Sequence, residues 1–309
     1  MTFDRPAQLL AMLIVEAAIG YPAFLFHRIG HPVSWIGMLI TTLESSWNTG
    51  KAKRKRAAGL VLLFAIATAA GSAGWLIEHV TGNGPAILLI ILCGTTGLAQ
   101  RSLHEHVIGV LHPLRSNDLP GARAAVSRIV GRDTGTLDEA GVSTAAIESL
   151  AESFCDGIVA PAFWFLVAGL PGLFVAKAIN TADSMVGHRD ERFRDFGWAS
   201  ARADDLINLL PARLSGLLIA LAAMRGLRTM LRYARHHASP NGGWPEAAMA
   251  GAIGRKLGGP VSYDGEPAAR AALGDGSPPL AANLVEALQI YRRGCLLLWL
   301  AVGALAWLR

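Results

Sequence analysis

Six long apolar runs constrain the fold of this chain more than any other feature of its sequence. They lie at about residues 7–26, 57–77, 84–100, 157–179, 206–224 and 294–308. A helix that crosses a bilayer needs roughly 20 apolar residues, and the second run meets that length. Only 17% of the residues are charged, whereas a soluble domain is usually nearer a quarter. We therefore predict an all-α, polytopic integral membrane protein with a single domain over residues 1–309.

Proline interrupts the fourth and fifth runs. The fourth contains Pro161 and Pro171, and the fifth contains Pro211 together with Arg213. Proline removes a helical hydrogen bond, and in lipid the freed carbonyl needs a protein or water partner. Interrupted segments of this kind often line a polar cavity or return to the side from which they came. The sequence therefore predicts broken or re-entrant helices here.

The first run is predicted to be a retained membrane helix. It contains Glu16, and no small-x-small cleavage site follows it, so it does not fit a cleaved signal peptide.

Basic residues predict the orientation of the chain. Lys51, Lys53, Arg54, Lys55 and Arg56 directly precede the second run, and such clusters favour the cytoplasmic side. In a membrane protein the formal charge of +5 indicates loops that face anionic lipid rather than nucleic-acid binding. The three cysteines, Cys93, Cys155 and Cys295, form no CxxC pair, so neither a zinc ribbon nor a disulfide framework is indicated.

Three carboxylates share a spacing of four residues near the fourth run. Glu148, Glu152 and Asp156 would lie on one face of a helix. Such a stack repels itself unless arginine or a divalent cation relieves the repulsion, and hard oxygen ligands suit magnesium. A solvated acidic stripe explains the same spacing about equally well, so both interpretations stay open.

Two further polar clusters flank the loop 180–205. Lys177, Asn180 and Asp183 end the fourth run, where charged and amide groups are costly and tend to be functional. Lys177 taken alone is better explained by snorkelling at a helix end. If the loop is a short lid between re-entrant segments, both of its ends meet at one site.

The cluster at the other end of that loop combines acids with arginines. Asp204, Asp205 and Asn208 lie within one helical turn. Arg202 and Arg213 could clamp phosphate or carboxylate, or pair with the acids. In a membrane protein, we favour a functional role for this cluster over a purely structural pairing of its charges.

A fourth polar segment runs from Ser239 to Glu246. Its small residues would let backbone amides approach a ligand, although Asn241-Gly242 is equally an ordinary turn. The Gly- and Pro-rich stretch 239–279 is expected to consist of ordered turns. The common phosphate-binding loop and the dinucleotide fingerprint are absent from the sequence.

Taken in order, these motifs resemble the adenosylcobinamide-phosphate synthase family, the CobD/CbiB type. The matching stretches are His31-Pro32-Val33 with Ile36-Gly37, Val130-Gly131-Arg132-Asp133-Thr134, Glu148 to Pro161, Asn180-Thr181-Ala182-Asp183-Ser184-Met185, Ala201-Arg202-Ala203-Asp204-Asp205, Pro211-Ala212-Arg213 and Ser239 to Glu246. They cover roughly residues 9 to 290. The family usually has other residues where Glu16, Tyr21 and Ser153 stand, so no role is assigned to those positions.

The resemblance implies a multi-pass enzyme of the bacterial inner membrane with its active-site loops in the cytoplasm. It would join adenosylcobyric acid to an aminoalcohol phosphate, (R)-1-aminopropan-2-yl phosphate, by an amide bond, with ATP and Mg²⁺. We assign catalysis to Glu148, Glu152 and Asp183, and metal binding to Glu148, Glu152, Asp156, Asp204 and Asp205. Substrate binding is assigned to Arg132, Lys177, Asn180, Arg202, Asn208, Arg213, Asn241 and Glu246.

Two other functions remain open. A non-enzymatic membrane sensor of the AmpE-like branch would keep the scaffold but lose the acidic and arginine clusters, which are present here. A transporter would need charges deep inside paired spans, whereas most polar clusters here lie in or beside loops. The expected partners are the two substrates and the lipid bilayer, without nucleic acid, and a homo-oligomer is left open.

The charge distribution generates a topological prediction. Loops 27–56, 101–156 and 225–291 should all face the cytoplasm. Single cysteines placed in these loops should resist an impermeant thiol reagent applied to intact cells. Labelling of any of the three loops from outside would contradict this topology.

Overall fold

The computed structural model describes residues 4–81, 87–188, 190–263 and 265–308. The chain folds into two compact units, and each unit draws on separate parts of the sequence. Unit 1 comprises residues 1–99, 160–208 and 302–309, and unit 2 comprises residues 100–159 and 209–301. No single cut through the chain separates them, and the single domain expected over residues 1–309 stays a prediction.

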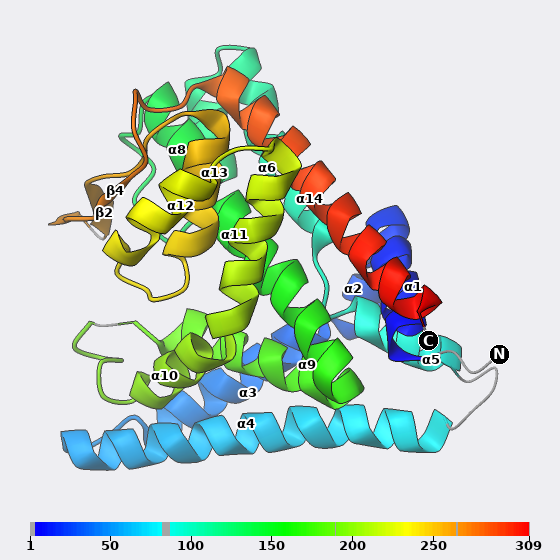
Figure 1. Cartoon of the computed structure of the whole chain (residues 1–309). Helices are drawn as coiled ribbons and strands as arrows, with labels where there is room; N and C mark the ends of the chain where they lie inside the picture. The colour runs from blue at the N-terminus through cyan, green and yellow to red at the C-terminus, as the bar shows by residue number, and fades with distance from the viewer. Residues whose placement is uncertain (1–3, 82–86, 189, 264, 309) are drawn as a thin grey trace. The chain divides into compact units, whose positions relative to one another are not determined.

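Unit 1 is helical (Figure 1). Its helices are α1 (Arg5–Ile19), α2 (Ala23–Ile29), α3 (Pro32–Trp47), α4 (Ala52–Thr81), α5 (Ile87–Thr95), α9 (Ala160–Val186) and α10 (Trp198–Ile207). Helix α4 packs closely because it carries glycines where it touches its neighbours. A Cβ at Gly74 would lie 2.6 Å from the backbone nitrogen of Pro171 in α9. Small residues of this kind let helices approach where lipid offers no hydrophobic drive for association.

Helix α9 is broken in the middle, as the sequence predicts. Ala168 and Gly169 leave helical geometry, and Gly169 has φ +67°. Pro171, which lacks an N–H, begins the second half of the helix. The carboxylate of Glu78 in α4 accepts a hydrogen bond of 2.7 Å from the N–H of Leu170. Glu78 therefore caps the half-helix at a point where lipid could not satisfy the backbone.

The first apolar run departs from the single membrane helix expected over residues 7–26. Helix α1 ends at Ile19, because Gly20 takes φ +66° and Pro22 follows it. The next helical segment, Ala23–Trp47, is bent by 97° from α1. This part of the chain is either a broken span or a re-entrant loop.

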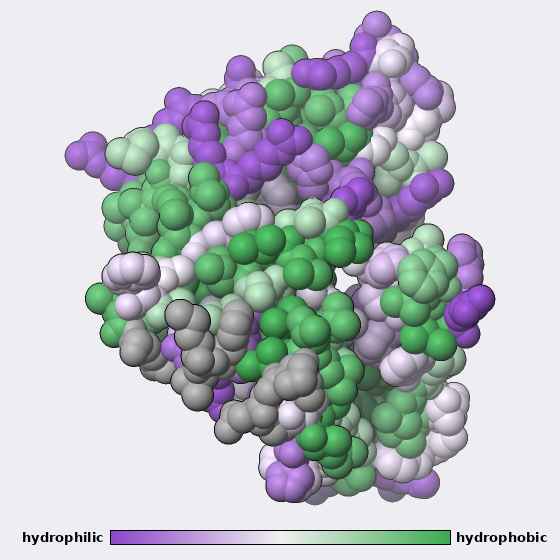
Figure 2. All heavy atoms as spheres, turned by 90° about the vertical axis from the view of Figure 1, so that its right-hand side faces the viewer, coloured by the Kyte–Doolittle hydropathy of each residue, from purple (hydrophilic) through white to green (hydrophobic). Residues whose placement is uncertain are grey.

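Several helices are long and apolar enough to cross a membrane. The four that qualify alone are Ala52–Thr81, Ile87–Arg115, Glu139–Val186 and Ala281–Trp307, and two bent pairs bring the number to as many as six. Large hydrophobic side chains such as Phe64, Trp75 and Val80 are exposed along α4. Figure 2 shows hydrophobic side chains over much of the visible surface. The beginning of the third predicted run, residues 84–86, lies outside the described residues.

Unit 2 contains the remaining helices and all the described strands. Its helices are α6 (Gln100–Arg115), α7 (Leu119–Val126), α8 (Glu139–Phe154), the π-helix η1 (Cys155–Val159), α11 (Leu209–Ala223), α12 (Leu227–Tyr233), the 3₁₀-helix η2 (Ala234–His236), α13 (Gly243–Ile253) and α14 (Ala281–Trp307), whose last residues belong to unit 1. Helix α8 is buried on almost every side from Val142 to Ala151. Its polar residues therefore need partners inside the protein.

The stretch 239–279 is more regular than the ordered turns expected from its composition. It contains helix α13 and two short antiparallel strand pairs. Strand β1 (Leu257–Gly258) pairs with β4 (Ala272–Leu273), and between them β2 (Val261–Tyr263) forms a hairpin with β3 (Glu266–Ala268). Asp133 holds this hairpin, since its carboxylate accepts hydrogen bonds from the Ser262 hydroxyl at 2.6 Å and the Gly265 N–H at 2.9 Å.

The α9 break generates a stability prediction. Gly169→Ala should lower the free energy of unfolding by about 1–3 kcal/mol through the backbone alone, because φ +67° with ψ −155° is a conformation essentially confined to glycine. It should also disturb the cap, because the new Cβ would lie 2.2 Å from Oε1 of Glu78. A thermal melt in detergent measures the effect. Gly109→Ala in α6 is the matched control, since nothing lies within 4 Å of its Cβ, and an equal loss in both variants would contradict this role of the break.

Candidate functional site

Glu148 is the centre of a buried charge cluster in unit 2. Its side chain is only 1% exposed, and it forms ion pairs with Arg132 and, at 3.3 Å, with Arg270. The N–H of Gly258 donates a third hydrogen bond to it at 2.5 Å. A carboxylate buried in this way is stable only when cations and donors occupy its lone pairs. Glu148 therefore joins α8 to two segments distant in sequence.

Arg270 extends the cluster to helix α13. Its Nη2 donates to Nε2 of His237 at 3.0 Å and to Oε1 of Glu246 at 3.4 Å. Because a guanidinium group only donates hydrogen bonds, we assign to His237 the tautomer in which Nε2 carries no proton. Glu246 is fully buried, and His237 Nε2 lies 3.3 Å from its Oε1.

Glu246 lies beside another carboxyl group, that of Glu152. No donor reaches Oε2 of Glu246 among the described residues. Two carboxyl oxygens can share a hydrogen bond only when one carries a proton. Burial first, and then the charges of Glu152 and Glu148, raise the pKa of Glu246 well above its usual value.

His237 is kept neutral by its surroundings. Burial lowers its pKa, and the charge of Arg270 lowers it further, although Glu152 acts in the opposite direction. A neutral imidazole can accept a proton or bind a metal. Within the described ranges, two guanidinium groups pair with the carboxylates of this cluster, those of Arg132 and Arg270, whereas Glu148, Glu152 and Glu246 make three acids. The cluster therefore lacks one positive charge, which a proton or a bound cation would supply.

Glu152, His237 and Glu246 form the group that could hold a metal ion within the described ranges of the chain. Their ligand atoms lie within 4.8 Å of one another. The histidine nitrogen suits a transition metal better than magnesium, which prefers oxygen. Arg270 already contacts two of these ligand atoms, so a metal would have to displace its guanidinium.

Arg213 and Asn241 form a neighbouring contact in unit 2. Arg213 donates to Oδ1 of Asn241 at 3.0 Å, and its guanidinium lies 4.6 Å from the ring centroid of Trp244. The hydroxyl of Ser239 accepts from the backbone N–H groups of Asn241 and Gly242, each at 3.2 Å. The turn preceding α13 therefore has a fixed geometry, with the guanidinium held over an aromatic face.

Unit 1 contains a separate acidic cluster at the end of α9. Asp204 accepts hydrogen bonds from Asn180 at 3.4 Å and from Asn208 at 3.0 Å. Asp204 and Asp205 lie close enough to Asp183 to act on its charge. The two ends of loop 180–205 thus meet, as expected from the sequence. Oδ1 of Asn208 is buried and has no donor partner among the described residues.

Cations border the acidic cluster of unit 1. Lys177 acts electrostatically on Asp204 and on His31, the N-cap of α3. Arg202 lies 3.5 Å from Asp205, but its side chain is 66% exposed. An ion pair with so exposed a partner contributes little to stability, which leaves Arg202 available to other anions.

The structure brings together only some of the residues predicted to serve catalysis, metal binding or substrate binding. Arg132, Glu148, Glu152 and Glu246 meet in unit 2, and Lys177, Asn180, Asp183, Asp204, Asp205 and Asn208 meet in unit 1. Asp156 lies in the π-helix η1, where the backbone departs from the α-helical phase on which the spacing argument rests. Sequence reasoning assigned no role to His237 or Arg270. The spacing of the acids on α8 indicated that an arginine or a divalent cation could lie beside them, but the sequence did not show which arginine.

The cluster predicts opposite effects for two identical substitutions. Glu148→Gln should destabilise the protein by about 3–5 kcal/mol, because the largely buried guanidinium of Arg132 loses its charge partner and that of Arg270 keeps only Glu246. Glu246 has a raised pKa in the folded state. Its contribution to stability is therefore complete when the pH is below its pKa in the unfolded chain, and is lost as the pH rises toward its pKa in the folded protein. Glutamine cannot ionise, so the variant Glu246→Gln does not lose stability in this way. The melting temperature of Glu246→Gln minus that of wild type should therefore increase as pH rises above about 4.5, the ordinary pKa of the carboxyl group.

Thermal melts in detergent across a pH series measure both effects. The exposed variant Glu266→Gln is the control. Equal destabilisation by Glu148→Gln and Glu246→Gln at every pH would contradict this charge distribution.

Comparison with known proteins places these features in a family. The family model described as CobD/Cbib protein matches residues 9–291. A protein named "Cobalamin biosynthesis protein CobD" from Rhodobacter capsulatus is 49% identical over 305 residues, which cover 97% of each chain. Proteins of the same name from Brucella suis and Rhizobium meliloti are 48% and 43% identical, over 82% and 96% of each chain. No solved structure matches. The chain therefore belongs to the CobD/CbiB family of cobalamin biosynthesis proteins.

Proposed function

We propose that this chain is an ATP-dependent ligase, adenosylcobinamide-phosphate synthase. It joins a carboxylate of adenosylcobyric acid to the amine of (R)-1-aminopropan-2-yl phosphate and yields adenosylcobinamide phosphate. The observation that carries the proposal is the buried cluster of unit 2, in which Glu152, Glu246 and a neutral His237 adjoin paired arginines. Buried carboxyl groups with a shifted pKa are typical of sites that transfer protons.

The reaction needs activation because a carboxylate does not react with an amine at neutral pH. In the proposed route, the carboxylate attacks the γ-phosphate of ATP, and an acyl phosphate and ADP form. The amine, after losing a proton, attacks the acyl carbon, and phosphate leaves as the amide forms. The site must therefore remove a proton from the ammonium group and stabilise negative charge on the phosphates.

The unit 2 cluster supplies groups for the proton transfer. The pKa of His237 is lowered by burial, its side chain is 10% exposed, and its Nε2 carries no proton in the assigned tautomer. The one missing positive charge beside Glu152 and Glu246 suits the substrate's ammonium group. We assign ammonium binding to Glu152 and Glu246, and proton acceptance to His237 or Glu152. Glu148 positions Arg132 and Arg270 in this scheme.

The unit 1 cluster is the better match to magnesium. Asp183, Asp204, Asp205 and Asn208 offer oxygen atoms, which Mg²⁺ prefers, and the buried Oδ1 of Asn208 lacks a donor among the described residues. The ion, when bound there, would neutralise the phosphates of ATP. Lys177 and the exposed Arg202 supply further positive charge for the same anions. This assignment extends the proposed magnesium ligands to Asp183 and Asn208, while Glu148 is engaged by its arginines.

Two other functions give different outcomes in the same system. A membrane sensor would bind the corrinoid without consuming ATP. A transporter would accumulate substrate inside sealed vesicles without making a product. The buried acids of unit 2 favour catalysis, because a sensor has no need for a neutral imidazole between carboxyl groups.

The test is product formation by purified protein. Given adenosylcobyric acid, aminopropanol phosphate and Mg-ATP, the wild-type protein in lipid nanodiscs should form the amide together with ADP, as detected by mass spectrometry. Glu152→Gln should reduce kcat about 100-fold or more through loss of a charge at the reacting groups, while its melting temperature stays near that of wild type.

Glu266→Gln again provides the matched control, since Glu266 is exposed in strand β3. Wild-type turnover by Glu152→Gln would remove Glu152 from the catalytic groups. Substrate binding without any product from the wild-type protein would overturn the ligase proposal and favour the sensor.

A further inference from the structure

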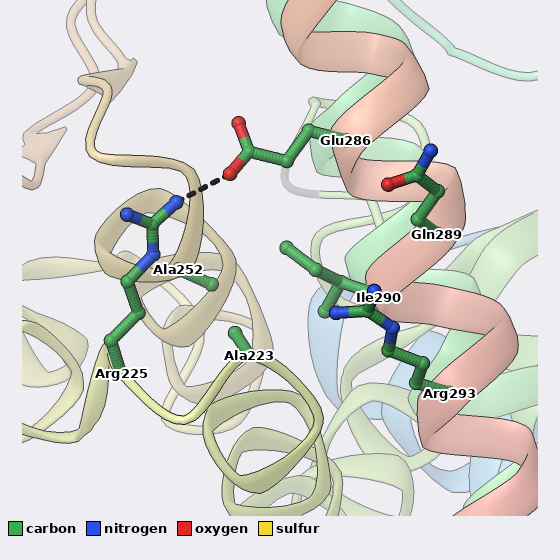
Figure 3. A pocket seen from close by; sticks show the side chains of 7 residues that line it. All are labelled: Ala223, Arg225, Ala252, Glu286, Gln289, Ile290 and Arg293. Atoms are coloured by element: carbon green, nitrogen blue, oxygen red, sulfur yellow. Dashed lines mark hydrogen bonds and ion pairs between the residues drawn. The ribbon is translucent and has the colours of Figure 1, made fainter.

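A polar cavity in unit 2 lies apart from the predicted site residues. Its volume is about 260 Å³, and its polar lining consists of Arg225, Glu286, Gln289 and Arg293 (Figure 3). The last three side chains come from one face of α14, since their positions differ by three and four residues. No sequence motif pointed to this cavity.

Arg225 is held by an unusual turn between α11 and α12. Met224 takes φ +54°, a left-handed conformation that is rare outside glycine. Gly226 follows with φ +98°, and a Cβ there would lie 2.6 Å from the carbonyl oxygen of Ala248. The N–H of Arg225 donates to the carbonyl of Ala220 at 3.1 Å. This closed turn fixes the start of the Arg225 side chain, which then pairs with Glu286.

Arg293 has no such partner. Among the described residues no ion pair or hydrogen bond engages its guanidinium, although it lines the cavity. Its neighbour Arg292 donates to Nε2 of His104 at 2.6 Å. After Arg293 the chain carries no charged residue until Arg309, so Arg293 stands in the middle of α14, where the polar first half of this candidate membrane helix meets its apolar second half.

We propose that this cavity binds the phosphate group of a phosphate ester. The planar guanidinium of Arg293 offers two parallel donors that match two phosphate oxygens. Arg225, which keeps donors beyond its pair with Glu286, and the amide of Gln289 complete the set. With one carboxylate against two guanidinium groups, the lining keeps a net positive charge. This proposal does not depend on the ligase function.

The phosphate group has two possible sources. The cavity is several times larger than the volume of about 30 Å³ that one water molecule occupies in the liquid, so it admits either a lipid headgroup or a soluble phosphate ester. Basic pockets beside membrane helices commonly bind anionic headgroups. Ala223, Ala252 and Ile290 supply the apolar part of the lining, which suits the carbon atoms next to the phosphate.

The experiment compares two probes on the full-length protein. Inorganic phosphate is titrated in uncharged detergent by calorimetry, and phosphatidylglycerol retained from mixed phosphatidylcholine nanodiscs is measured by native mass spectrometry. Arg293→Gln should weaken binding about tenfold in the arm that shows binding. Glu286→Gln should strengthen it, because Arg225 loses its internal partner. A response in the first arm identifies a soluble ester, and a response only in the second identifies lipid.

Arg292→Gln is the matched control, since it removes the same charge one residue away while leaving the cavity lining intact. Its binding should equal that of wild type. Absence of binding in both arms would overturn the proposal, and so would equal weakening by Arg292→Gln and Arg293→Gln, which would indicate a general effect of charge.

Discussion

The ion pairs of Glu148 are the interaction on which unit 2 depends. This single buried carboxylate holds Arg132 and Arg270, which come from segments 16 residues before it and 122 residues after it. Without it, the largely buried guanidinium of Arg132 would lose its charge partner and that of Arg270 would keep only Glu246, and an uncompensated buried charge costs several kcal/mol. Glu148 and Glu246 together hold Arg270 against His237. The geometry of the candidate site is therefore a consequence of charge compensation around α8.

Unit 1 obeys a different constraint, which comes from the bilayer. Backbone groups in hydrocarbon need partners within the protein, and the break in α9 meets that need with a side chain from α4. Glu78 caps the half-helix that begins near Leu170 and ends beside Asp183. Each candidate cluster thus lies near an interrupted helix, since the π-helix η1 directly follows the carboxylates of α8. Such interruptions free backbone groups and redirect side chains where function requires it.

The sequence predicts the helices better than the site. Apolar runs depend on local composition, so their helices and the break near Pro171 could be predicted. Helix α13 was missed because glycine and proline dominate the composition around it. His237 and Arg270 were missed for another reason: their importance comes from contacts with residues more than 80 positions away. Spacing along one helix placed Glu148 and Glu152 on one face, but it could not separate a solvated acidic stripe from a site that pairs with cations, nor name the chain segment that supplies the arginines.

The sign of the local charge assigns different ligands to the sites. In unit 2, Glu148, Glu152 and Glu246 outnumber their two arginines, and in unit 1 the three aspartates outnumber Lys177 and Arg202. Such clusters repel a bare phosphate, so under the proposed function a phosphorylated substrate would need a divalent cation there, whereas an ammonium group would not. The cavity beside Arg293 has the opposite sign and can hold a phosphate group without a metal. Under the two proposals, the sign of the charge thus separates the acidic clusters, which would bind the amine and the metal ion, from the cavity beside Arg293, which would bind phosphate directly.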